Sequence, residues 1–337
     1  MEQERKARSR RITAEQVANA AGVSRSAVSR AFTVGAYLDK GKRTEILKVA
    51  QELGYRPNAL AAGLQGEGRS NLVAIVTGSL ANHYDGDVLS LLVRGLNVMG
   101  KWPVIVGGSE DMSEAEVLNV LAYPLDALIL RGGSVDESVM IHCSKLNVPL
   151  IVSGRVMRSE GVDCVCCDNR RGAEIAVSEL LKKGRTRLGY IGGSEHLSSD
   201  QERKAGFEFA VRRAGLLPEA IVQADYSHEG GYRLLSELIQ SGCELDGLFC
   251  ANDAMALGAI AAARCEFGIS VPADLSVIGF DDLAMAAWPE FGLSTMRNDM
   301  EKTVSHILRM LGERLSAPEK QGEMVLIEPE FIFRNTH

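Results

Sequence analysis

The sequence lacks the features of a membrane or secreted protein. It has no run of about 18 apolar residues, the length that a membrane-spanning helix needs. Its basic start, residues 1–11, is not followed by the apolar stretch of a secretory signal. Its seven cysteines are an odd number without the spacing of a small disulfide scaffold. We therefore expect a cytoplasmic protein with reduced thiols and no contact with a membrane.

The motifs of common enzymes are also missing. The chain has no G-x-x-x-x-G-K-[ST] loop, no G-x-G-x-x-G after a strand and no G-x-S-x-G elbow. His228 and Glu229 lack the second histidine of a zinc helix. On a strand, Cys167 would point away from Cys164 and Cys166, so these thiols suit buried apolar positions better than a metal site. The sequence favours a protein that is not an enzyme and holds no cofactor or metal.

Charge is distributed unevenly along the 337 residues, whose composition is that of a globular protein with two or three domains. Residues 1–65 contain 12 Lys and Arg against 6 Asp and Glu, a net charge of +6. The remainder contains 25 basic and 38 acidic residues, a net charge of −13. A small basic head on an acidic body indicates that the head binds a polyanion. A solvated basic tail is the alternative that charge alone leaves open.

The basic head has the pattern of a helix-turn-helix. Thr13 and Gln16 form a capping box that starts a first short helix. Ser24 is placed to cap a second helix, Arg25 to about Phe32, and Gly22 supplies the tight turn between the two helices. Two short helices joined by a turn that contains Gly are typical of DNA-binding heads.

A third helix and a linker follow this pair. The third helix is expected from about residue 40 to residue 53, with Gly54 as its C-cap. Asn58 could cap one more helix of two turns, which is marginal in isolation because so short a helix does not recover the cost of nucleation. We place the DNA-binding head at residues 1–56 and the hinge helix and linker at 57–70.

From residue 71 onward, apolar runs of strand length alternate with amphipathic helical stretches. The expected strands are residues 72–76, 103–106, 127–130, 149–152, 188–191, 247–250 and 277–279. The expected helices include residues 87–99, 114–122, 171–183, 203–214 and 254–267. Such alternation indicates parallel sheets covered on both faces. We therefore expect an α/β body at 71–337, built from two doubly wound parallel-sheet domains with a cleft at the strand ends.

The residues that directly follow these strands are unusually polar. Asp281 and Asn252 lie nearest the sheet edges, so we expect them to contact a ligand, although Asp281 could instead satisfy backbone donors. Carboxylates, amides and an arginine beside an aromatic ring such as Tyr84 suit a small hydroxylated ligand. Asp253 and Asp282 are better placed to be helix N-caps.

The head motif, AAGVSRSAVSR at residues 20–30, closely resembles the helix-turn-helix of the lactose/galactose repressor (LacI/GalR) family of bacterial transcriptional regulators. LGYRPNALA at 53–61 is similar to that family's entry to its hinge helix. The body resembles the family at residues 168–173, 203–207, 251–258 and 277–282. The resemblance implies a periplasmic-binding-protein-like body with an N-subdomain (about 71–168 plus 298–327) and a C-subdomain (about 169–297 plus 328–337).

The resemblance also implies which residues contact DNA and ligand. Positions of the second helix that meet the major groove are Ser24, Arg25, Ser26, Ala27, Ser29 and Arg30. Arg25, Ser26 and Arg30 match side chains that face base edges. Later positions that match phosphate, hinge and minor-groove contacts are Tyr37, Asn58, Ala61 and Leu64. Positions that match effector contacts are Ser199, Arg203, Tyr232, Asn252 and Asp281.

The chain departs from the family at three places. Thr33 stands where Asn is usual after the recognition helix. Gly63 stands where a larger residue is usual, which weakens the hinge helix. Ser153 precedes Gly154 and Arg155 without the acid that is common there, which removes one acceptor for a ligand hydroxyl.

Taken with the charge, the resemblance predicts a transcriptional repressor that binds a pseudo-palindromic operator as a homodimer. Its effector would be a sugar, sugar acid or polyol that releases the DNA. A solute-binding protein is disfavoured by the head, and an enzyme is disfavoured by the missing motifs. An activator stays open, because the position of the operator decides between activation and repression.

Overall fold

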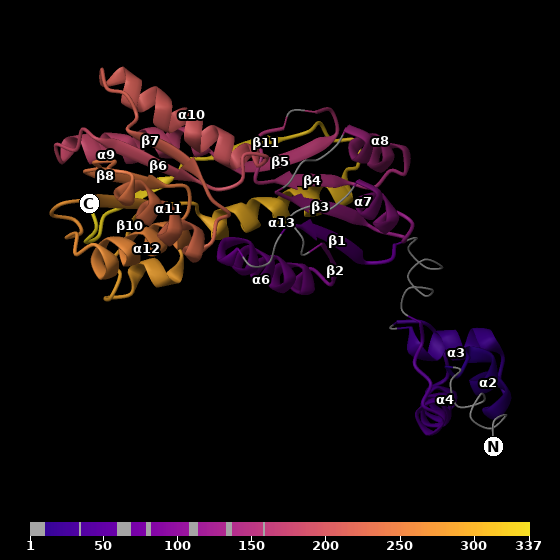
Figure 1. Ribbon diagram of the computed structural model, residues 1–337. Helices are drawn as coiled ribbons and strands as arrows, with labels where there is room; N and C mark the ends of the chain where they lie inside the picture. The colour runs from indigo at the N-terminus through magenta and orange to yellow at the C-terminus, as the bar shows by residue number, and fades with distance from the viewer. Residues whose placement is uncertain are drawn as a thin grey trace. The chain divides into compact units, whose positions relative to one another are not determined.

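The computed structural model describes residues 11–33, 35–58, 69–78, 82–107, 114–132, 137–157 and 159–337. The chain forms two compact units, a head up to Ser70 and a body over Asn71–His337. The head contains the indigo helices α2 to α4 of Figure 1, and every strand among the described residues lies in the body. No helix among the described residues is long and apolar enough to cross a membrane.

The head is a three-helix unit, as the sequence predicts. It contains α2 (Ala14–Ala20), α3 (Arg25–Phe32) and α4 (Lys40–Leu53). The Thr13–Gln16 capping box and the Ser24 cap are both present, and Gly54 ends α4 in the left-handed conformation, with φ of 70°. Val17, Val28 and Ile46, one from each helix, are fully buried in a shared core. This core leaves the other faces of the short helices in solvent.

The first half of the body is a parallel six-stranded sheet, ordered β11-β5-β4-β3-β1-β2. Its strands are β1 (Leu72–Thr77), β2 (Trp102–Gly107), β3 (Ala127–Arg131), β4 (Leu150–Ser153), β5 (Val162–Cys167) and β11 (Met324–Ile327). Its helices are α6 (His83–Val98), α7 (Glu114–Val120), α8 (Glu137–Lys145) and α13 (Met300–Ser316).

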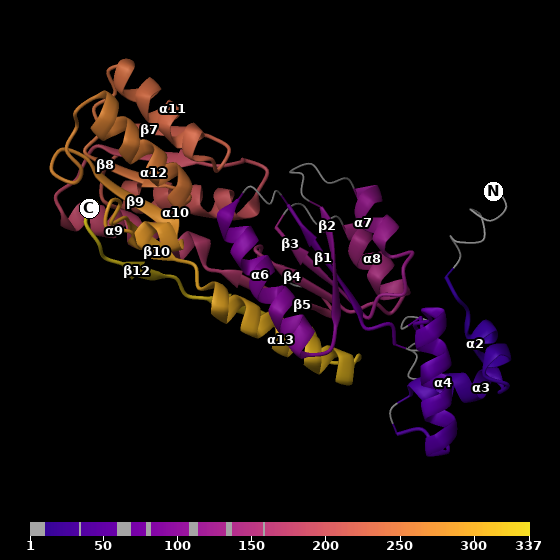
Figure 2. The same ribbon diagram turned by 90° about the horizontal axis from the view of Figure 1, so that it is seen from below.

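Both faces of this sheet are covered by helices. Alternate strand residues such as Val73 and Ile75 pack with α6 and α13. The residues between them, such as Ala74 and Val76, pack with α7 and α8. Figure 2 shows α6 and α13 side by side on one face, with α7 and α8 on the other. Two-sided coverage explains why the strands are continuous apolar runs in the sequence.

The second half of the body contains the other six-stranded sheet, ordered β12-β10-β9-β8-β6-β7. Its strands are β6 (Leu188–Gly192), β7 (Ala220–Gln223), β8 (Gly247–Cys250), β9 (Ser276–Asp281), β10 (Ser294–Arg297) and β12 (Glu330–Ile332). Only β12 is antiparallel to its neighbour. Its helices are α9 (Asn169–Lys182), α10 (Ser198–Arg213), α11 (His228–Gln240), α12 (Asp253–Ala261), the π-helix η1 (Ala262–Glu266) and the 3-10 helix η2 (Ala284–Ala287).

The chain crosses between the two sheets three times, from β5 to α9, from β10 to α13 and from β11 to β12. The first crossing passes Asp168 and the second passes Asn298, directly after the carboxyl ends of β5 and β10. These crossings therefore bring residues of both halves to one region, where the carboxyl ends of the strands meet.

All seven strands expected from the sequence are present, and five more accompany them: β5, β7, β10, β11 and β12. Several of the expected helices begin earlier than predicted; α10, for example, starts at Ser198 and not at Arg203. Polar first turns hide these starts, because the apolar periodicity begins only after them. The predicted helix over 254–267 is divided, since α12 changes into the π-helix η1.

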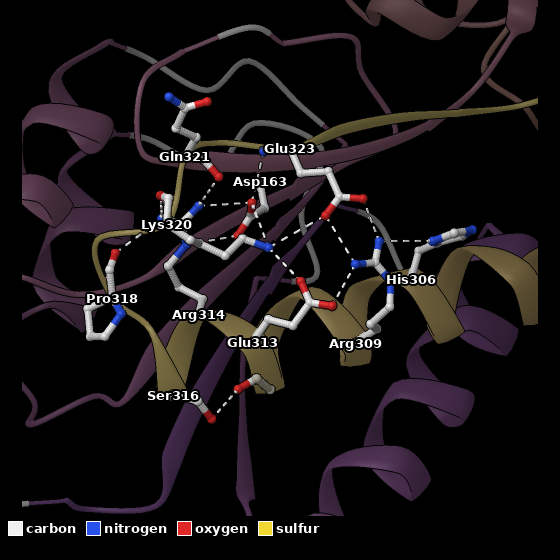
Figure 3. Close-up of polar contacts among 11 residues, drawn as sticks. Asp163, His306, Arg309, Glu313, Arg314, Ser316, Pro318, Lys320, Gln321 and Glu323 are labelled. Atoms are coloured by element: carbon white, nitrogen blue, oxygen red, sulfur yellow. Dashed lines mark hydrogen bonds and ion pairs between the residues drawn. The ribbon is translucent and has the colours of Figure 1, made fainter.

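A buried group of charges lies at the opposite edge of the first sheet, where its strands begin (Figure 3). Asp163, near the start of β5, is fully buried and pairs with Arg314 near the end of α13. Arg314 donates to the two carboxylate oxygens at 3.0 and 2.9 Å, and the backbone N–H of Glu323 donates to Asp163 at 3.0 Å. This Asp163 cluster joins α13 to the segment that leads into β11.

Candidate functional site

A cavity in the body is lined by the carboxyl ends of strands from both sheets. Its walls include Arg131, Ser153 and Cys167 from the first sheet and Asp281 from the second. The cavity has a volume of about 90 Å³, enough for several water molecules or for part of a small polar ligand. This is the region where open α/β sheets bind ligands.

Arg203 forms one wall of the cavity. It lies in the second turn of α10 and is 5% exposed. Its Nε donates to Asn169 Oδ1 at 2.9 Å, and its Nη1 donates to the carbonyl of Ala251. Its Cζ lies 3.7 Å from the ring centroid of Phe280, in a cation–π contact. The guanidinium is therefore held in a fixed orientation beside the cavity.

Asp281 lies opposite this guanidinium, at the end of β9. Its Oδ1 is 3.6 Å from Arg203 Nη2, and Asn298 Nδ2 donates to it at 3.4 Å. Burial raises the pKa of Asp281 to about 6, although Arg203 and Asn298 act in the lowering direction. Its φ of 114° is one that L residues rarely adopt. Strain of this kind concentrates at functional sites.

The other wall carries a second charged pair. Arg131, the last residue of β3, is 5% exposed. Its Nη2 donates to Asp85 Oδ1 at 2.8 Å, and its Nη1 donates to Ser153 Oγ at 3.3 Å. Tyr84, at the start of α6, places its ring centroid 6.0 Å from Arg131 Cζ. The cavity thus combines charged donors, charged acceptors and an aromatic ring.

Four of the six residues predicted to contact a ligand line this cavity: Tyr84, Ser199, Arg203 and Asp281. Asn252 does not line it, because its side chain caps α12 by accepting from the N–H of Met255 and donates to the carbonyl of Tyr226. Tyr232 interacts instead with Glu266 of η1. The aromatic residue that lines the cavity from this part of the chain is Tyr226.

The prediction that Asp253 and Asp282 are N-caps is wrong. Asp253 is fully buried and accepts hydrogen bonds from the N–H of Leu283 and the hydroxyl of Thr295. Asp282 pairs with Arg297 at 2.8 Å and with Arg334 at 2.6 Å. These partners are distant in the sequence, so local spacing could not reveal them.

Several more residues shape the cavity but were not predicted as ligand contacts. Asn82, Asp85, Arg131 and Ser153 belong to the polar residues that follow the expected strands, and Tyr226 is one of the aromatic residues that suit such a ligand; Asn169 and Asn298 complete the set. A signal was present for Arg131 and Ser153, because each is the last residue of an apolar strand. Asn298 had no such signal, because the short strand before it was not expected.

The three cysteines of β5 are buried, and Cys166 and Cys167 line the cavity. Burial raises the pKa of the Cys167 thiol to about 12. A thiol with so high a pKa stays protonated at neutral pH, and the neutral form is a weak nucleophile and a poor metal ligand. No group of His, Cys, Asp or Glu in the described part of the chain could hold a metal ion.

The second helix of the head, α3, presents a polar surface. Ser24, Arg25, Ser26, Ser29 and Arg30 are exposed, and Ala27 is half-buried beside them. Arg30 Nη2 donates to Ser26 Oγ at 3.4 Å, one turn away. Arg43 of α4 donates to the carbonyls of Ala31 and Ala36. These bonds connect α4 to the end of α3 and to Ala36. They therefore hold α3, which carries the exposed polar face, against α4.

The remaining residues predicted to contact DNA lie outside α3. Tyr37 is 92% exposed, and Asn58, the last residue of the described segment 35–58, is also exposed. Ala61, Leu64 and the unusual Gly63 lie outside the described residues.

Comparison with protein families gives two matches. Residues 13–58 match the family described as bacterial regulatory proteins, lacI family. Residues 177–337 match the periplasmic binding protein-like domain. The first match covers the helix-turn-helix, and the second covers most of the half of the body that contains Arg203 and Asp281.

Curated relatives match nearly the whole chain. The "Probable HTH-type transcriptional repressor ExuR" of Bacillus subtilis is 28% identical over 330 residues, which are 96% of this chain and 98% of that protein. The HTH-type transcriptional regulator AscG of Escherichia coli is 29% identical, with 88% of this chain and 90% of that protein covered. Catabolite control protein A of Priestia megaterium is 25% identical, with 96% and 99% covered.

Two solved structures of the Lac repressor also match nearly the whole chain. The Lac repressor bound to ONPG in its repressed state superimposes with a TM-score of 0.85 at 25% identity, covering 97% of this chain and 100% of that one. The Lac repressor dimer bound to operator and the anti-inducer ONPF gives a TM-score of 0.82, also at 25% identity, with 97% and 99% covered.

Proposed function

The chain belongs to the LacI family of bacterial regulatory proteins, and we propose that a small hydroxylated metabolite in the body cavity controls its affinity for operator DNA. The family makes the chain a DNA-binding transcriptional regulator, in keeping with the transcriptional regulators among its relatives. The observation that carries the proposal is the buried pair of Arg203 and Asp281, held on a cavity where the two sheets meet.

This pair suits a ligand that has several hydroxyl groups. A carboxylate accepts hydrogen bonds from hydroxyls, a guanidinium donates to their oxygens, and bonds to charged groups are stronger than neutral ones. Tyr84 and Tyr226 add aromatic surface on which C–H groups can pack. We propose Tyr84, Ser199, Arg203 and Asp281 as ligand contacts, joined by Asp85 and Arg131.

The cavity is also placed to couple ligand binding to movement of the body. Asn298 donates to Asp281 and belongs to the crossing between β10 and α13. Asn169 accepts from Arg203 and lies at the crossing between β5 and α9. A ligand that binds Arg203 and Asp281 therefore contacts residues that are hydrogen-bonded to two of the three connections between the halves.

If ligand and operator favour different arrangements of these halves, each weakens the binding of the other. We propose the inducer direction, in which ligand binding releases the DNA and relieves repression, with residues 57–70 as the hinge.

On the DNA side, we propose that α3 reads the major groove. The exposed Arg25, Ser26 and Arg30 are donors and acceptors of the kind that read base edges there. The Lac repressor that binds operator in the structure compared above does so as a dimer. We therefore propose that this chain acts as a homodimer on a pseudo-palindromic operator, and hence in the cytoplasm, where the chromosome lies.

Calorimetric titration of the full-length Asp281→Asn variant tests the effector site. The effector affinity should fall at least tenfold, about 1.4 kcal/mol, because a charged acceptor is lost. Operator affinity without effector should stay within about twofold of the original. A variant that melts earlier but keeps its effector affinity would remove Asp281 from the site. An effector that tightens operator binding would make it a corepressor and contradict the inducer direction.

Binding to selected and random DNA tests the interface on the head. Arg30→Ala should lose about 1–3 kcal/mol on the operator and relax one base position, if the side chain contacts a base. Lys42→Ala is the matched control, because an exposed lysine that meets phosphate should weaken all sequences alike and reduce the salt dependence. An equal loss on both DNAs for Arg30→Ala would show that Arg30 contacts the backbone.

A further inference from the structure

Arg131 is a buried arginine of the cavity with one buried nitrogen that has no partner among the described residues. Its Nη2 donates to Asp85 and its Nη1 donates to Ser153. Its Nε is buried and has no hydrogen-bond partner among the described residues. A buried donor without an acceptor is costly, and native structures usually satisfy such groups. With an acceptor supplied by a ligand, all three guanidinium nitrogens of Arg131 would have hydrogen-bond partners.

Arg203, on the opposite wall, differs in this respect. Its Nε and Nη1 have protein acceptors, Asn169 and the carbonyl of Ala251, and its Nη2 faces Asp281. The two arginines therefore have different capacities for a ligand. Arg203 is oriented by the protein and shares Asp281 with the cavity, whereas Arg131 retains an unused N–H.

The charge of Arg131 is also only partly balanced by its neighbour. The Arg131 side chain is 4% exposed, whereas the Asp85 side chain is 26% exposed. Water reaches the carboxylate of Asp85 and weakens its field, while the guanidinium stays buried. A single hydrogen bond, from Nη2 to Oδ1 at 2.8 Å, joins the two groups. The charge of the buried Arg131 guanidinium is thus only partly offset by Asp85.

A planar guanidinium with a free N–H beside a second nitrogen suits a carboxylate, which presents two acceptor oxygens and a negative charge. We infer that the effector is a sugar acid, whose carboxylate binds Arg131 while its hydroxyls bind Arg203 and Asp281 on the opposite wall. This inference rests on the proposed function, because it names the class of ligand for the same cavity.

Two other ligand classes fit less well. A neutral sugar can fill the acceptor position of Nε with one hydroxyl oxygen but leaves the partly exposed Asp85 as the counter-charge of Arg131. A phosphate ester brings close to two negative charges into a cavity that already contains Asp85 and Asp281. Like charges at short range raise the cost of binding, so one negative charge is the better match.

Calorimetry on the full-length protein tests the inference with matched probes. The acids are D-glucuronate, D-galacturonate and D-gluconate, and their neutral partners are D-glucose, D-galactose and D-glucitol; D-glucose 6-phosphate represents the esters. We expect one acid to bind at least tenfold more tightly than its neutral partner and than the ester. A neutral sugar or the ester that binds as tightly as the best acid, or no binding by any acid, would overturn the inference.

Variants at Arg131 assign the effect to this residue. Arg131→Gln should lower the affinity for the acid at least tenfold and that for its neutral partner by much less, because the neutral ligand loses only a hydrogen bond to a hydroxyl oxygen. Arg131→Lys, which keeps the charge but loses the planar fork, should lose less. Arg309→Gln changes an exposed arginine of α13 that pairs with Glu323 beside the Asp163 cluster, and it should alter neither affinity. Unchanged acid affinity in Arg131→Gln would overturn the inference.

The melting temperature of each variant, measured without ligand, shows whether it is folded. Operator affinity, measured on the same samples, tests the proposed function separately: a chain that binds an operator and responds to a neutral sugar keeps that function and loses only the sugar-acid assignment.

Discussion

Two groups of buried charges lie at opposite edges of the first sheet, and they differ in how completely their hydrogen bonds are satisfied. In the Asp163 cluster, all three nitrogens of Arg314 have acceptors, namely Asp163 and the carbonyls of Pro318, Lys320 and Gln321 (Figure 3). At the cavity, Arg131 keeps one buried nitrogen without a partner among the described residues. Buried charge alone therefore does not distinguish the two groups; the unused hydrogen-bonding capacity of Arg131 beside a cavity does.

The two groups of buried charges also differ in their surroundings. Lys320 lies 3.6 Å from Asp163 and joins it to Glu313 and Glu323, each of which also pairs with Arg309. These outer pairs are partly exposed and individually contribute little. They lie around Asp163, which is fully buried. The open pocket beside them is lined by Glu323 but not by Asp163 or Arg314. The cavity, by contrast, is open to an occupant between its two arginines.

The largest expected effect is on stability, in the Asp163 cluster. Asp163→Asn should lower the free energy of unfolding by about 3–5 kcal/mol, because it leaves Arg314 buried without a counter-charge. Urea denaturation of the full chain measures this loss. The double variant Asp163→Leu with Arg314→Met should recover much of it, since apolar side chains of similar volume replace both charges. A loss below about 1 kcal/mol for Asp163→Asn would contradict the structural role of the Asp163 cluster.

Arg203 tests the boundary between the two kinds of charge, since it is both bonded to the protein and open to the cavity. Arg203→Lys should lose about 1–3 kcal/mol of stability, because Asn169 and the carbonyl of Ala251 lose the planar donor between them. It should also lose about tenfold in effector affinity. Denaturation and calorimetry on one preparation separate the two losses. A loss of stability alone would make Arg203 a purely structural residue, and a loss of effector affinity alone would make it purely a ligand contact.

The pH dependence of effector binding sharpens the comparison further. Burial raises the pKa of Asp281 to about 6, against the opposing influence of Arg203 and Asn298 and together with the charge of Asp85. The ionised form accepts hydroxyl hydrogen bonds, so effector affinity should fall about tenfold from pH 7 to pH 5, as the carboxylate is protonated. Calorimetry at several pH values measures this fall, and Asp281→Asn should abolish it.

Stability should respond to the same group in the opposite sense. A carboxyl whose pKa is raised by folding binds its proton more tightly in the folded state than in the unfolded one. Its contribution to stability is therefore most favourable at low pH and is lost as the pH rises toward and through about 6. The difference between the original chain and Asp281→Asn, followed by denaturation from pH 5 to pH 7, isolates this contribution. Equal pH profiles for the two proteins would contradict the assignment.

The smallest expected effect is on stability at the cavity. Arg131→Gln should change the free energy of unfolding by less than about 1 kcal/mol, because Asp85 is partly exposed and water can replace its partner. Arg314→Gln is the matched substitution in the other cluster and should cost several times more. Urea denaturation of the two variants side by side measures the ratio. Equal losses would show that Arg131 is as structural as Arg314.

The sequence predicted the head and the frame of the body, because both depend on local signals. The capping box at Thr13 and the cap at Ser24 are short-range patterns, and the strands of the two sheets are continuous apolar runs. Four of the five missed strands have four residues or fewer; β12, for example, spans Glu330–Ile332. The fifth, β5, has six residues, but Asp163 interrupts its apolar run.

The cavity was only partly predictable. Asp281 was expected from its place at a sheet edge and Arg203 from the family resemblance, and both line the cavity. Asn252 was misplaced because an asparagine after a strand serves equally well as a helix cap, and only the structure shows that α12 uses it. Arg131 and Asp85 are 46 residues apart. Their pairing depends on the register of β1 and β3, which sequence alone does not give.

The most direct test of the account is the operator affinity of the full-length protein, measured by fluorescence anisotropy on an operator obtained by in vitro selection, with and without a saturating sugar acid from the panel above. The account predicts that the acid weakens operator binding at least tenfold in the original chain and has little effect in Arg131→Gln at the same concentration. An acid that binds the body by calorimetry but leaves operator affinity unchanged would contradict the account.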